Sequence, residues 1–334
     1  MRVLLALLMT ATAWAASIDE IQGAIDEART AGGGRVCVPQ GKYYLSAPLN
    51  LRDCVNVTLD CEPGTLLVAR YPETGAAWPV VDMTGAYRTT LVGCRVYNDR
   101  AYQWPACGVL LARSQTKAPN FNALRDVVVD GFFTKASIVN VGSECFHITR
   151  CDVRHHGETG CALYLGRWNE LGIASPHGPV LYDSTSMAGG TVDGSTHLSI
   201  YGEGDRTRRC IVWLADGAHS VFLRDFYTTG KDDIDAVFWL GSQGREPVWN
   251  VHVGPWHDEC WDAANLVRVL TQTQGCTIGG ALVRCGQLTS FVPTNHNYAD
   301  GLSIREVVHR PHRDYWIGQP VPVAAPGNNQ DGTE

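Results

Sequence analysis

The sequence predicts an all-β solenoid, a right-handed single-stranded parallel β-helix whose N-terminal end is capped by a short helix. Three observations predict this fold. Short apolar strands recur at intervals of roughly 23–30 residues along most of the 334-residue chain. Helical periodicity is confined to one short segment near the N-terminus. Hydrophobic residues make up 45% of the chain and charged residues 18%, which is enough apolar material for a long continuous core.

Residues 1–15 are predicted to be a signal peptide. Arg2 is a short positive region, Val3–Met9 form an apolar run, and Ala13-Trp14-Ala15 fits the small-x-small cleavage pattern. The apolar run is too short to span a bilayer, and no later segment resembles a membrane span. The alternative is that this segment is a buried strand or helix. We expect a secreted or extracellular protein, with the surface of a virion as a second location.

The charge and the cysteines narrow the classes of function. A formal net charge of −7 argues against nucleic-acid binding, because that binding requires Lys and Arg to neutralise phosphates. None of the 12 cysteines has zinc-type spacing, so no metal ligands are predicted from them. In an oxidising compartment they can form disulfides, whose connectivity the sequence leaves open. Cys54/Cys61 and Cys145/Cys151 are near enough in sequence to pair.

Residues 16–46 are predicted to form the N-terminal helix and cap. Ser17 is a suitable N-cap, and Glu20 three residues later completes a capping box. Gly32-Gly33-Gly34 ends the helix. The face that packs on the solenoid carries residues at helical spacing, namely Ile18, Ile21, Ala24, Ile25 and Ala28.

The same segment resembles a known family. An amphipathic helix, three glycines, the strand Arg35–Val38, Pro39-Gln40-Gly41 and then Tyr43-Tyr44 resemble the N-terminal cap of pectate-lyase-like β-helix proteins. That superfamily includes secreted pectinases and many phage tailspike depolymerases. The resemblance covers residues 17–44 and implies the β-helix fold, a polysaccharide ligand and a homotrimeric assembly. It is not specific for any one reaction.

Residues 47–310 are predicted to form the solenoid, with a loop insertion near 167–195 and a C-terminal tail or cap from 311 to 334. Two classes of strand recur within it. The first is apolar-x-apolar before a polar residue: Val57-Thr58-Leu59, Val127-Val128-Val129, Phe146-His147-Ile148, Leu198-Ser199-Ile200, Val221-Phe222-Leu223, Val251-His252-Val253 and Leu302-Ser303-Ile304. The second is apolar-x-apolar, in four cases before a small residue: Val139-Asn140-Val141, Leu163-Tyr164-Leu165, Val212-Trp213-Leu214, Phe238-Trp239-Leu240 and Val267-Arg268-Val269.

The second class predicts a binding surface. Strand side chains alternate, so if the flanking apolar residues fill the core, the central ones point outward. Stacked on successive coils, the rings would offer a flat apolar platform to a sugar. The predicted substrate-binding residues are Asn140, Tyr164, Trp213, Trp239 and Arg268. The alternative is that a loop or a neighbouring subunit covers these rings.

Carboxylates precede these strands at a constant offset. Glu158 lies six residues before Tyr164, Asp233 six before Trp239, and Asp262 six before Arg268. This constant offset predicts that the carboxylates gather on adjacent coils. Neighbouring carboxylates raise one another's pKa, so one can stay protonated and act as an acid while another is ionised and acts as a base. The predicted catalytic residues are Asp233, Asp262, Glu158, Asp232, Glu259 and His257. The alternative is that they are ordinary solvated turn residues.

Several reactions fit this pattern. A glycoside hydrolase needs two carboxyl groups flanking the scissile bond. A polysaccharide lyase would instead use the cluster to hold Ca²⁺ and a basic residue to remove the proton. Asp232-Asp233 resembles the aspartate pair of polygalacturonases, but that family's other motifs are missing. We therefore expect a hydrolase or lyase, and the alternative is a non-catalytic virion spike, receptor-binding protein or adhesin on the same fold.

Overall fold

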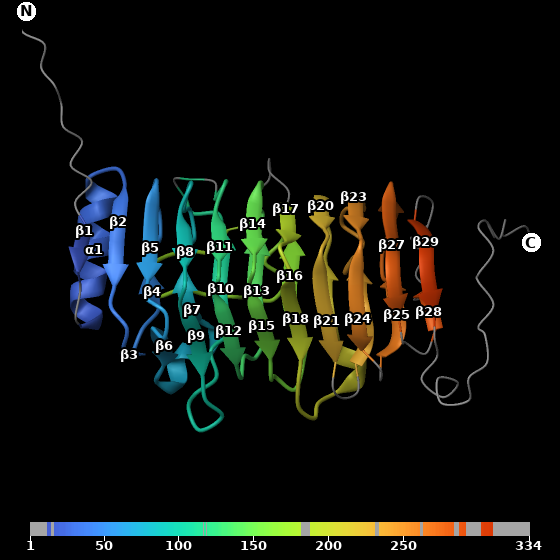
Figure 1. Ribbon diagram of the computed structural model, residues 1–334, viewed down its shortest axis with the longest axis horizontal. Helices are drawn as coiled ribbons and strands as arrows, with labels where there is room; N and C mark the ends of the chain where they lie inside the picture. Colours follow the sequence, from blue (N-terminus) through green and yellow to red (C-terminus); the bar gives the residue numbers. More distant parts are fainter. Residues whose placement is uncertain are drawn as a thin grey trace, which may run out of the picture.

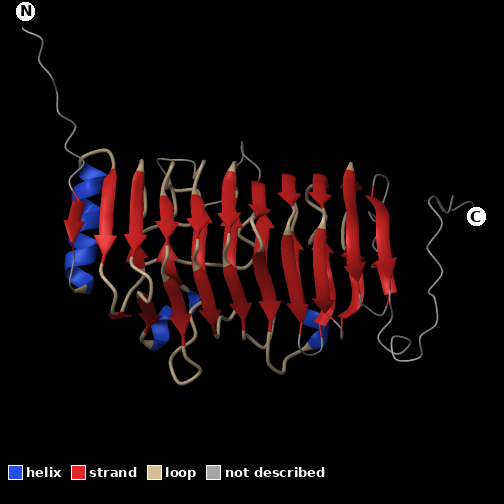
Figure 2. Cartoon of the chain, viewed as in Figure 1, coloured by secondary structure: helices blue, strands red, loops and turns tan. Residues whose placement is uncertain are grey.

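The structure is a computed structural model that describes residues 12–14, 17–115, 117, 119–181, 188–230, 234–260, 263–283, 287–291 and 302–309. Parallel strands lie side by side along the long axis, from α1 (Ile18–Thr30) at one end to β29 (Leu302–His309) at the other (Figures 1 and 2). Successive coils each add a strand to three faces, and the register between coils is parallel throughout the named strands of the described residues. The predicted right-handed parallel β-helix is confirmed.

Two faces belong to one continuous 20-stranded sheet that turns a corner along its length. Face one ends with β29. Its other strands are β1 (Thr12–Trp14), β2 (Gly34–Val38), β5 (Val57–Cys61), β8 (Thr90–Val92), β11 (Ala123–Arg125), β14 (Phe146–Thr149), β17 (Ala188–Asp193), β20 (Ala218–Leu223), β23 (Val248–Val253), β26 (Thr273–Gln274) and β27 (Cys276–Val283). Face two consists of β3 (Lys42–Leu45), β6 (Leu66–Ala69), β9 (Arg95–Asn98), β12 (Val128–Gly131), β15 (Asp152–His155), β18 (Thr196–Ile200), β21 (Phe226–Gly230) and β24 (Trp256–Cys260).

Face three is a separate 9-stranded sheet. Its strands are β4 (Leu49–Asn50), β7 (Pro79–Asp82), β10 (Cys107–Ala112), β13 (Ala136–Val141), β16 (Gly160–Gly166), β19 (Arg209–Leu214), β22 (Ile234–Leu240), β25 (Ala263–Val269) and β28 (Gln287–Phe291). Two short 3-10 helices, η1 (Glu73–Ala77) and η2 (Arg206–Arg208), lie in the connections.

The two predicted strand classes map onto the faces differently. The second class lies entirely on face three, in β13, β16, β19, β22 and β25. The first class divides between faces one and two, because Val128 and Val129 lie in β12 and Leu198–Ile200 in β18. The same apolar alternation occurs on faces one and two, so the pattern alone does not tell one of these faces from the other.

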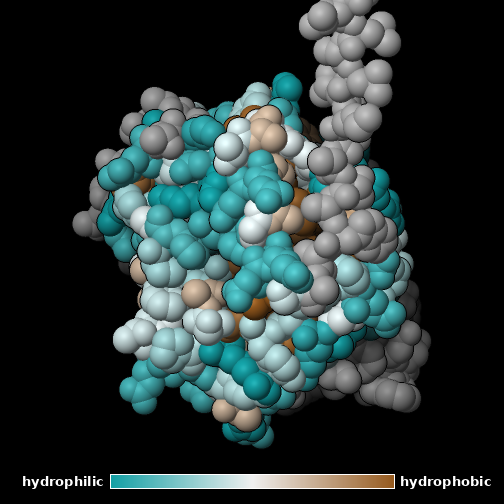
Figure 3. All heavy atoms as spheres, turned by 90° about the vertical axis from the view of Figure 1, so that its left-hand side faces the viewer, coloured by the Kyte–Doolittle hydropathy of each residue, from teal (hydrophilic) through white to brown (hydrophobic). Residues whose placement is uncertain are grey.

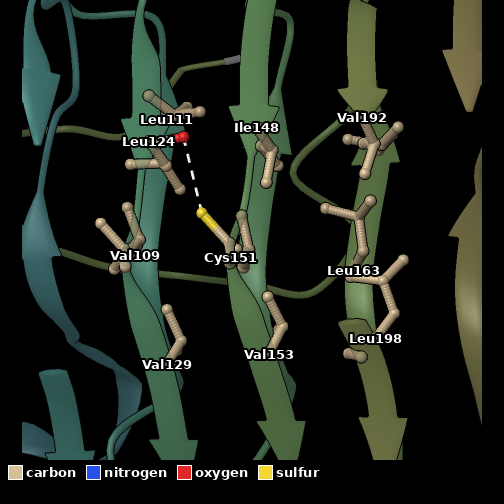
Figure 4. Packing of buried hydrophobic residues seen from close by; sticks show 14 of the residues in the cluster. Val109, Leu111, Leu124, Val129, Ile148, Cys151, Val153, Leu163, Val192 and Leu198 are labelled. Atoms are coloured by element: carbon tan, nitrogen blue, oxygen red, sulfur yellow. Dashed lines mark hydrogen bonds between the residues drawn. The ribbon is translucent and has the colours of Figure 1, made fainter. Parts of the chain in front are cut away.

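The core is a single continuous cluster enclosed by the three faces. Figure 4 shows Leu124, Ile148 and Val192 of face one pointing into it with Val129, Val153 and Leu198 of face two and Val109, Leu111 and Leu163 of face three. Inward positions repeat on every coil, so apolar residues stack along the axis and no coil has to bury its core alone.

Helix α1 closes the N-terminal end as predicted. Ser17 and Glu20 form the reciprocal capping box, and Ile21 and Ile25 are fully buried against the first coil. Gly32 and Gly33 follow with positive φ of 80° and 147°, which ends the helix. The outward surface at this end is mostly hydrophilic (Figure 3), as a solenoid cap requires to keep the end from adding further coils.

Residues 167–181 leave the solenoid after β16 and cross the outside of face three; we call them the strap. Ala174 N donates to Ala77 O, and His177 Nε2 lies 3.0 Å from Pro48 O, so the strap reaches back over β7 and β4. Buried Arg52 donates to Gly178 O at 3.3 Å and anchors its far end. Residues 188–193, which the sequence placed in the loop insertion, form β17.

Other sequence predictions fall partly outside the described residues. Of the predicted signal peptide, the structure describes Thr12–Trp14, which pair with β2. The predicted tail, 311–334, lies outside the described residues. In the described part of the chain, no helix has the length and apolar composition to cross a membrane.

The suggested pairing of Cys145 with Cys151 is wrong. Cys145 is exposed at the surface, whereas Cys151 is buried in the core, where its thiol donates to Leu124 O at 3.5 Å (Figure 4). A positive φ at Cys145 and at Arg150 turns the chain on either side of β14 and sends the two side chains in different directions.

One buried histidine should make the fold sensitive to acid. His155 is fully buried, with Nε2 2.8 Å from Thr159 O, and burial lowers its pKa to about 4. The unfolded chain takes up this proton as pH falls through about 6.5, whereas the folded protein does not until about 4. The contribution of neutral, buried His155 to the free energy of unfolding is therefore fully present above pH about 6.5 and is lost as the pH falls toward about 4.

We expect the protein to lose about 2 kcal/mol of unfolding free energy between pH 7 and pH 5 through His155. Denaturant melts at the two pH values should show that His155→Gln, which keeps a donor for Thr159 O, removes this loss. The half-exposed His257→Gln serves as the control and should retain it. An unchanged pH difference in His155→Gln would contradict the assignment.

Candidate functional site

The predicted aromatic ladder on face three exists. Tyr164, Trp213, Trp239 and Arg268 are partners on four successive strands. The ring centroids of Tyr164 and Trp213 are 5.3 Å apart and those of Trp213 and Trp239 5.2 Å apart, both at 81°. The rings therefore pack edge to face, not as one flat surface.

The prediction that this ladder is an open platform is wrong. Tyr164 is fully buried, Trp239 is buried and Trp213 is half-buried. Leu171, Ile173 and Val180 of the strap pack in the same apolar cluster. The Tyr164 hydroxyl donates to Trp168 O at 3.0 Å. The alternative reading of the sequence, in which a loop covers the rings, describes this face.

The remaining two predicted binding residues also have structural partners. Asn140 is 1% exposed and points inward, because its register partner is Leu165, not Tyr164. Its amide bonds Ser143 N at 2.7 Å and Ser143 O at 3.0 Å, closing the turn after β13. A shift of one residue reverses every side chain of a strand, so Val139 takes the outward position. Arg268 pairs with Asp235 at 2.5 Å.

The predicted carboxylate cluster lies largely outside the described residues. Asp232, Asp233 and Asp262 are not described, and Glu158 is exposed in the turn before β16. A calcium site at these positions stays a prediction. Within the described ranges, no group of three His, Cys, Asp or Glu side chains is arranged to hold a metal ion.

His257 and Glu259 lie together on the outer side of face two, away from the face three ladder. Both are on β24, with His257 Nε2 3.1 Å from Glu259 Oε1. The ring of Tyr227 on β21, 45% exposed, lies 5.8 Å from the imidazole. Strand β24 follows β23 around the corner, so these two residues face a different side of the solenoid from Trp239.

A groove of about 450 Å³ lies on the outer side of face one, across β14, β17 and β20. Its walls carry a carboxylate, two imidazoles and a phenyl ring on successive coils. The lining residues with functional side chains are Glu144, Cys145, His147, Thr191, His219 and Phe222. None of the site residues predicted from the sequence lines this groove.

Two glycines set the depth of the groove. Gly189 and Gly190 form its floor on β17, and a Cβ at Gly190 would lie 2.3 Å from Phe146 O. A Cβ at Gly189 would lie 2.4 Å from His219 O. Because neither glycine carries a side chain, the floor of the groove is backbone at these two positions, and Thr191 adds a side chain on the same strand.

The polar groups of the groove form two imidazole–carboxylate pairs. His147 Nε2 is 3.0 Å from Asp193 Oδ1, and His219 Nε2 is 3.7 Å from Glu144 Oε1. Arg224 lies 3.8 Å from the other oxygen of Asp193. A carboxylate beside an imidazole orients the ring and stabilises its protonated form, so such a pair can accept and return a proton.

The exposed aromatic surface predicted for face three is found here instead. Phe222 is 41% exposed, and its ring stacks on the imidazole of His252 on the next coil at 5.3 Å and 22°. The register places Thr191, Phe222 and His252 at equivalent outward positions. The signal that could have found them is the middle residue of the first strand class, which is His147, Phe222 and His252 in three of its members.

Cys145 is not suited to nucleophilic chemistry. Burial and the neighbouring carboxylate of Glu144 raise the pKa of its thiol, so it is protonated at neutral pH. The thiolate is the reactive form, and it requires the opposite environment. The groove therefore offers acid–base groups and an apolar ring.

No protein-family model matches the sequence, and no curated protein matches it. Solved structures with similar architecture include a tailspike protein of Acinetobacter baumannii bacteriophage Fri1, a capsular polysaccharide depolymerase, at 9% identity over 94% of this chain and 61% of that one, with a TM-score of 0.45. YbhC of Escherichia coli matches at 9% identity over 92% and 87%, with a TM-score of 0.47.

The tailspike of E. coli bacteriophage HK620, solved with a pentasaccharide, matches at 12% identity over 87% of this chain and 62% of that one, with a TM-score of 0.41. The chain spans about three fifths of the length of both tailspikes. Its own strand register and capping helix give it the right-handed parallel β-helix fold.

Proposed function

We propose that this protein is an extracellular protein that binds a polysaccharide in the face one groove and cleaves it there. The observation that carries the proposal is the joint presence of an exposed Phe222–His252 stack and two imidazole–carboxylate pairs around a glycine floor. The ring suits the apolar face of a sugar, and the open backbone and imidazoles suit its hydroxyl groups.

His147 and Asp193 are the proposed proton-transfer pair. Asp193 accepts from one imidazole nitrogen, and its other carboxylate oxygen faces Arg224. His147 has 41% of its side chain exposed beside the groove, so a sugar oxygen or carbon acid bound there is within its reach. His219 with Glu144 on the opposite wall supplies a second pair, so one can act as base and the other as acid.

We expect Asp193→Asn to lower the rate of polysaccharide cleavage about 100-fold or more, because the imidazole of His147 loses the carboxylate that orients it. Affinity should change by less than about twofold, since Phe222 is retained. Reducing-end release and binding to the same polysaccharide measure the two effects.

The matched control is Asp152→Asn on face two. Asp152 forms an equivalent pair with His197 at 3.1 Å, but it lies outside the groove. This variant should cleave at the unsubstituted rate at neutral pH. An equal loss of cleavage rate in both variants would show that misfolding causes the loss. An unchanged cleavage rate in Asp193→Asn would exclude His147 and Asp193 as the proton-transfer pair. Tight binding with no cleavage by any variant would identify a non-catalytic spike or adhesin.

A further inference from the structure

Two buried cysteines lie directly opposite one another on neighbouring coils of face three. Cys161 on β16 and Cys210 on β19 are partners in the parallel register. Both are 0% exposed and belong to the outer apolar cluster that contains Tyr164 and the strap residue Ile173. The proposed function makes no use of them.

Their geometry suits a covalent bond. Partners on adjacent strands have Cα atoms about 4.8 Å apart, within the range of about 4.4–6.8 Å that a disulfide spans. Both side chains point to the same side of the sheet. In the row of register partners that contains the two cysteines, Ala136 adjoins Cys161 and Ala236 adjoins Cys210. Their small side chains leave the two sulfur atoms room to adjust.

The Cys161 thiol also affects the thiol of Cys210. Burial and the neighbouring Cys161 thiol raise the pKa of Cys210 well above its ordinary value, so in the folded protein the Cys210 thiol is protonated and slow to react. Oxidation therefore has to occur as the coils assemble, while the cysteines are still accessible.

We propose that Cys161 and Cys210 form a disulfide that joins two neighbouring coils when the chain folds in oxidising surroundings. The two thiols lose two protons and two electrons as the S–S bond forms. A disulfide oxidant such as oxidised glutathione takes them up and is reduced to two molecules of thiol. The linked residues are 49 positions apart (210−161), and the enclosed segment includes the strap. The bond joins the start of β16 to the start of β19, on either side of the segment that contains the strap.

Peptide mapping of the full chain tests this directly. The protein is refolded in a buffer of oxidised and reduced glutathione, its remaining thiols are alkylated in denaturant, and it is digested without reductant. We expect a cross-linked peptide pair containing Cys161 and Cys210, lighter by two hydrogen atoms than the two peptides together. Reductant should lower the thermal midpoint by about 5–10 °C, because the closed loop restricts the unfolded chain.

Cys107 provides the matched control. It is fully buried in the same row and also adjoins Ala136, but its register partners are Ala136 and Pro79, not a cysteine. Cys161→Ala should remove this bond and its share of the reductant-dependent shift, and Cys107→Ala should keep both. Natively refolded protein with Cys161 and Cys210 both alkylated, or with Cys161 linked to another cysteine, would overturn the proposal. If Cys161→Ala does not fold, the peptide map of the unsubstituted protein alone shows whether Cys161 and Cys210 are linked.

Discussion

Tyr164→Ala is expected to lower the free energy of unfolding by about 3–5 kcal/mol. The tyrosine is fully buried, packs edge to face against Trp213 and donates to Trp168 O, so its removal leaves a cavity beneath the strap. Denaturant melts at neutral pH measure the loss. Tyr164→Phe should cost only about 1 kcal/mol, because it gives up the hydrogen bond and keeps the ring.

The same variants separate the two readings of face three. If the ladder is buried structure, as its packing indicates, folded Tyr164→Phe binds polysaccharide as well as the unsubstituted protein. A Tyr164→Ala protein that is as stable as the unsubstituted one but has lost its affinity for sugar would show that the ring is exposed in solution and contacts the ligand.

The second large effect is expected on binding. Phe222→Ala should weaken affinity for the polysaccharide about tenfold or more, because an exposed aromatic ring at the centre of a binding surface carries a large part of its free energy. Its effect on stability should stay below about 1 kcal/mol, since the ring is 41% exposed and packs mainly on His252. Titration with a labelled polysaccharide, beside a thermal melt, measures both.

Tyr44→Ala is the control for this experiment. Tyr44 has nearly the same exposed fraction, 40%, but lies on β3 near the N-terminal end of face two, away from the groove. It should bind normally. If Tyr44→Ala and Phe222→Ala lose affinity equally, the ring at position 222 has no special role and the groove is not the binding site.

Local chemistry made the N-terminal end and the strands of this fold predictable. The Ser17–Glu20 capping box and the glycines after the helix are fixed by backbone hydrogen bonds that involve only near neighbours. The apolar alternation on face three was equally clear, and the alignment of Tyr164, Trp213 and Trp239 follows from it. Each of these features depends on residues within one strand or one turn.

The errors arose where the path of the chain between strands decides the outcome. Whether Tyr164 is exposed depends on the strap, and its polar residues gave no sign that they cross face three and meet Arg52. Asn140 was placed outward because β13 is offset by one residue relative to the rest of its class. The face one groove depends on two glycines, Gly189 and Gly190, that interrupt the apolar pattern and hid β17 within a predicted loop.

The central claim, cleavage of a polysaccharide in the face one groove, is tested most directly by incubating the purified protein with a panel of neutral and acidic polysaccharides. Reducing-end release and the ultraviolet absorbance of unsaturated uronates would be recorded together, for the unsubstituted protein and for Asp193→Asn. We expect new reducing ends from at least one polysaccharide with the unsubstituted protein and their loss with Asp193→Asn. A gain in absorbance identifies a lyase, and new ends without it identify a hydrolase. Folded protein that releases no reducing ends from any member of a broad panel would contradict cleavage in this groove.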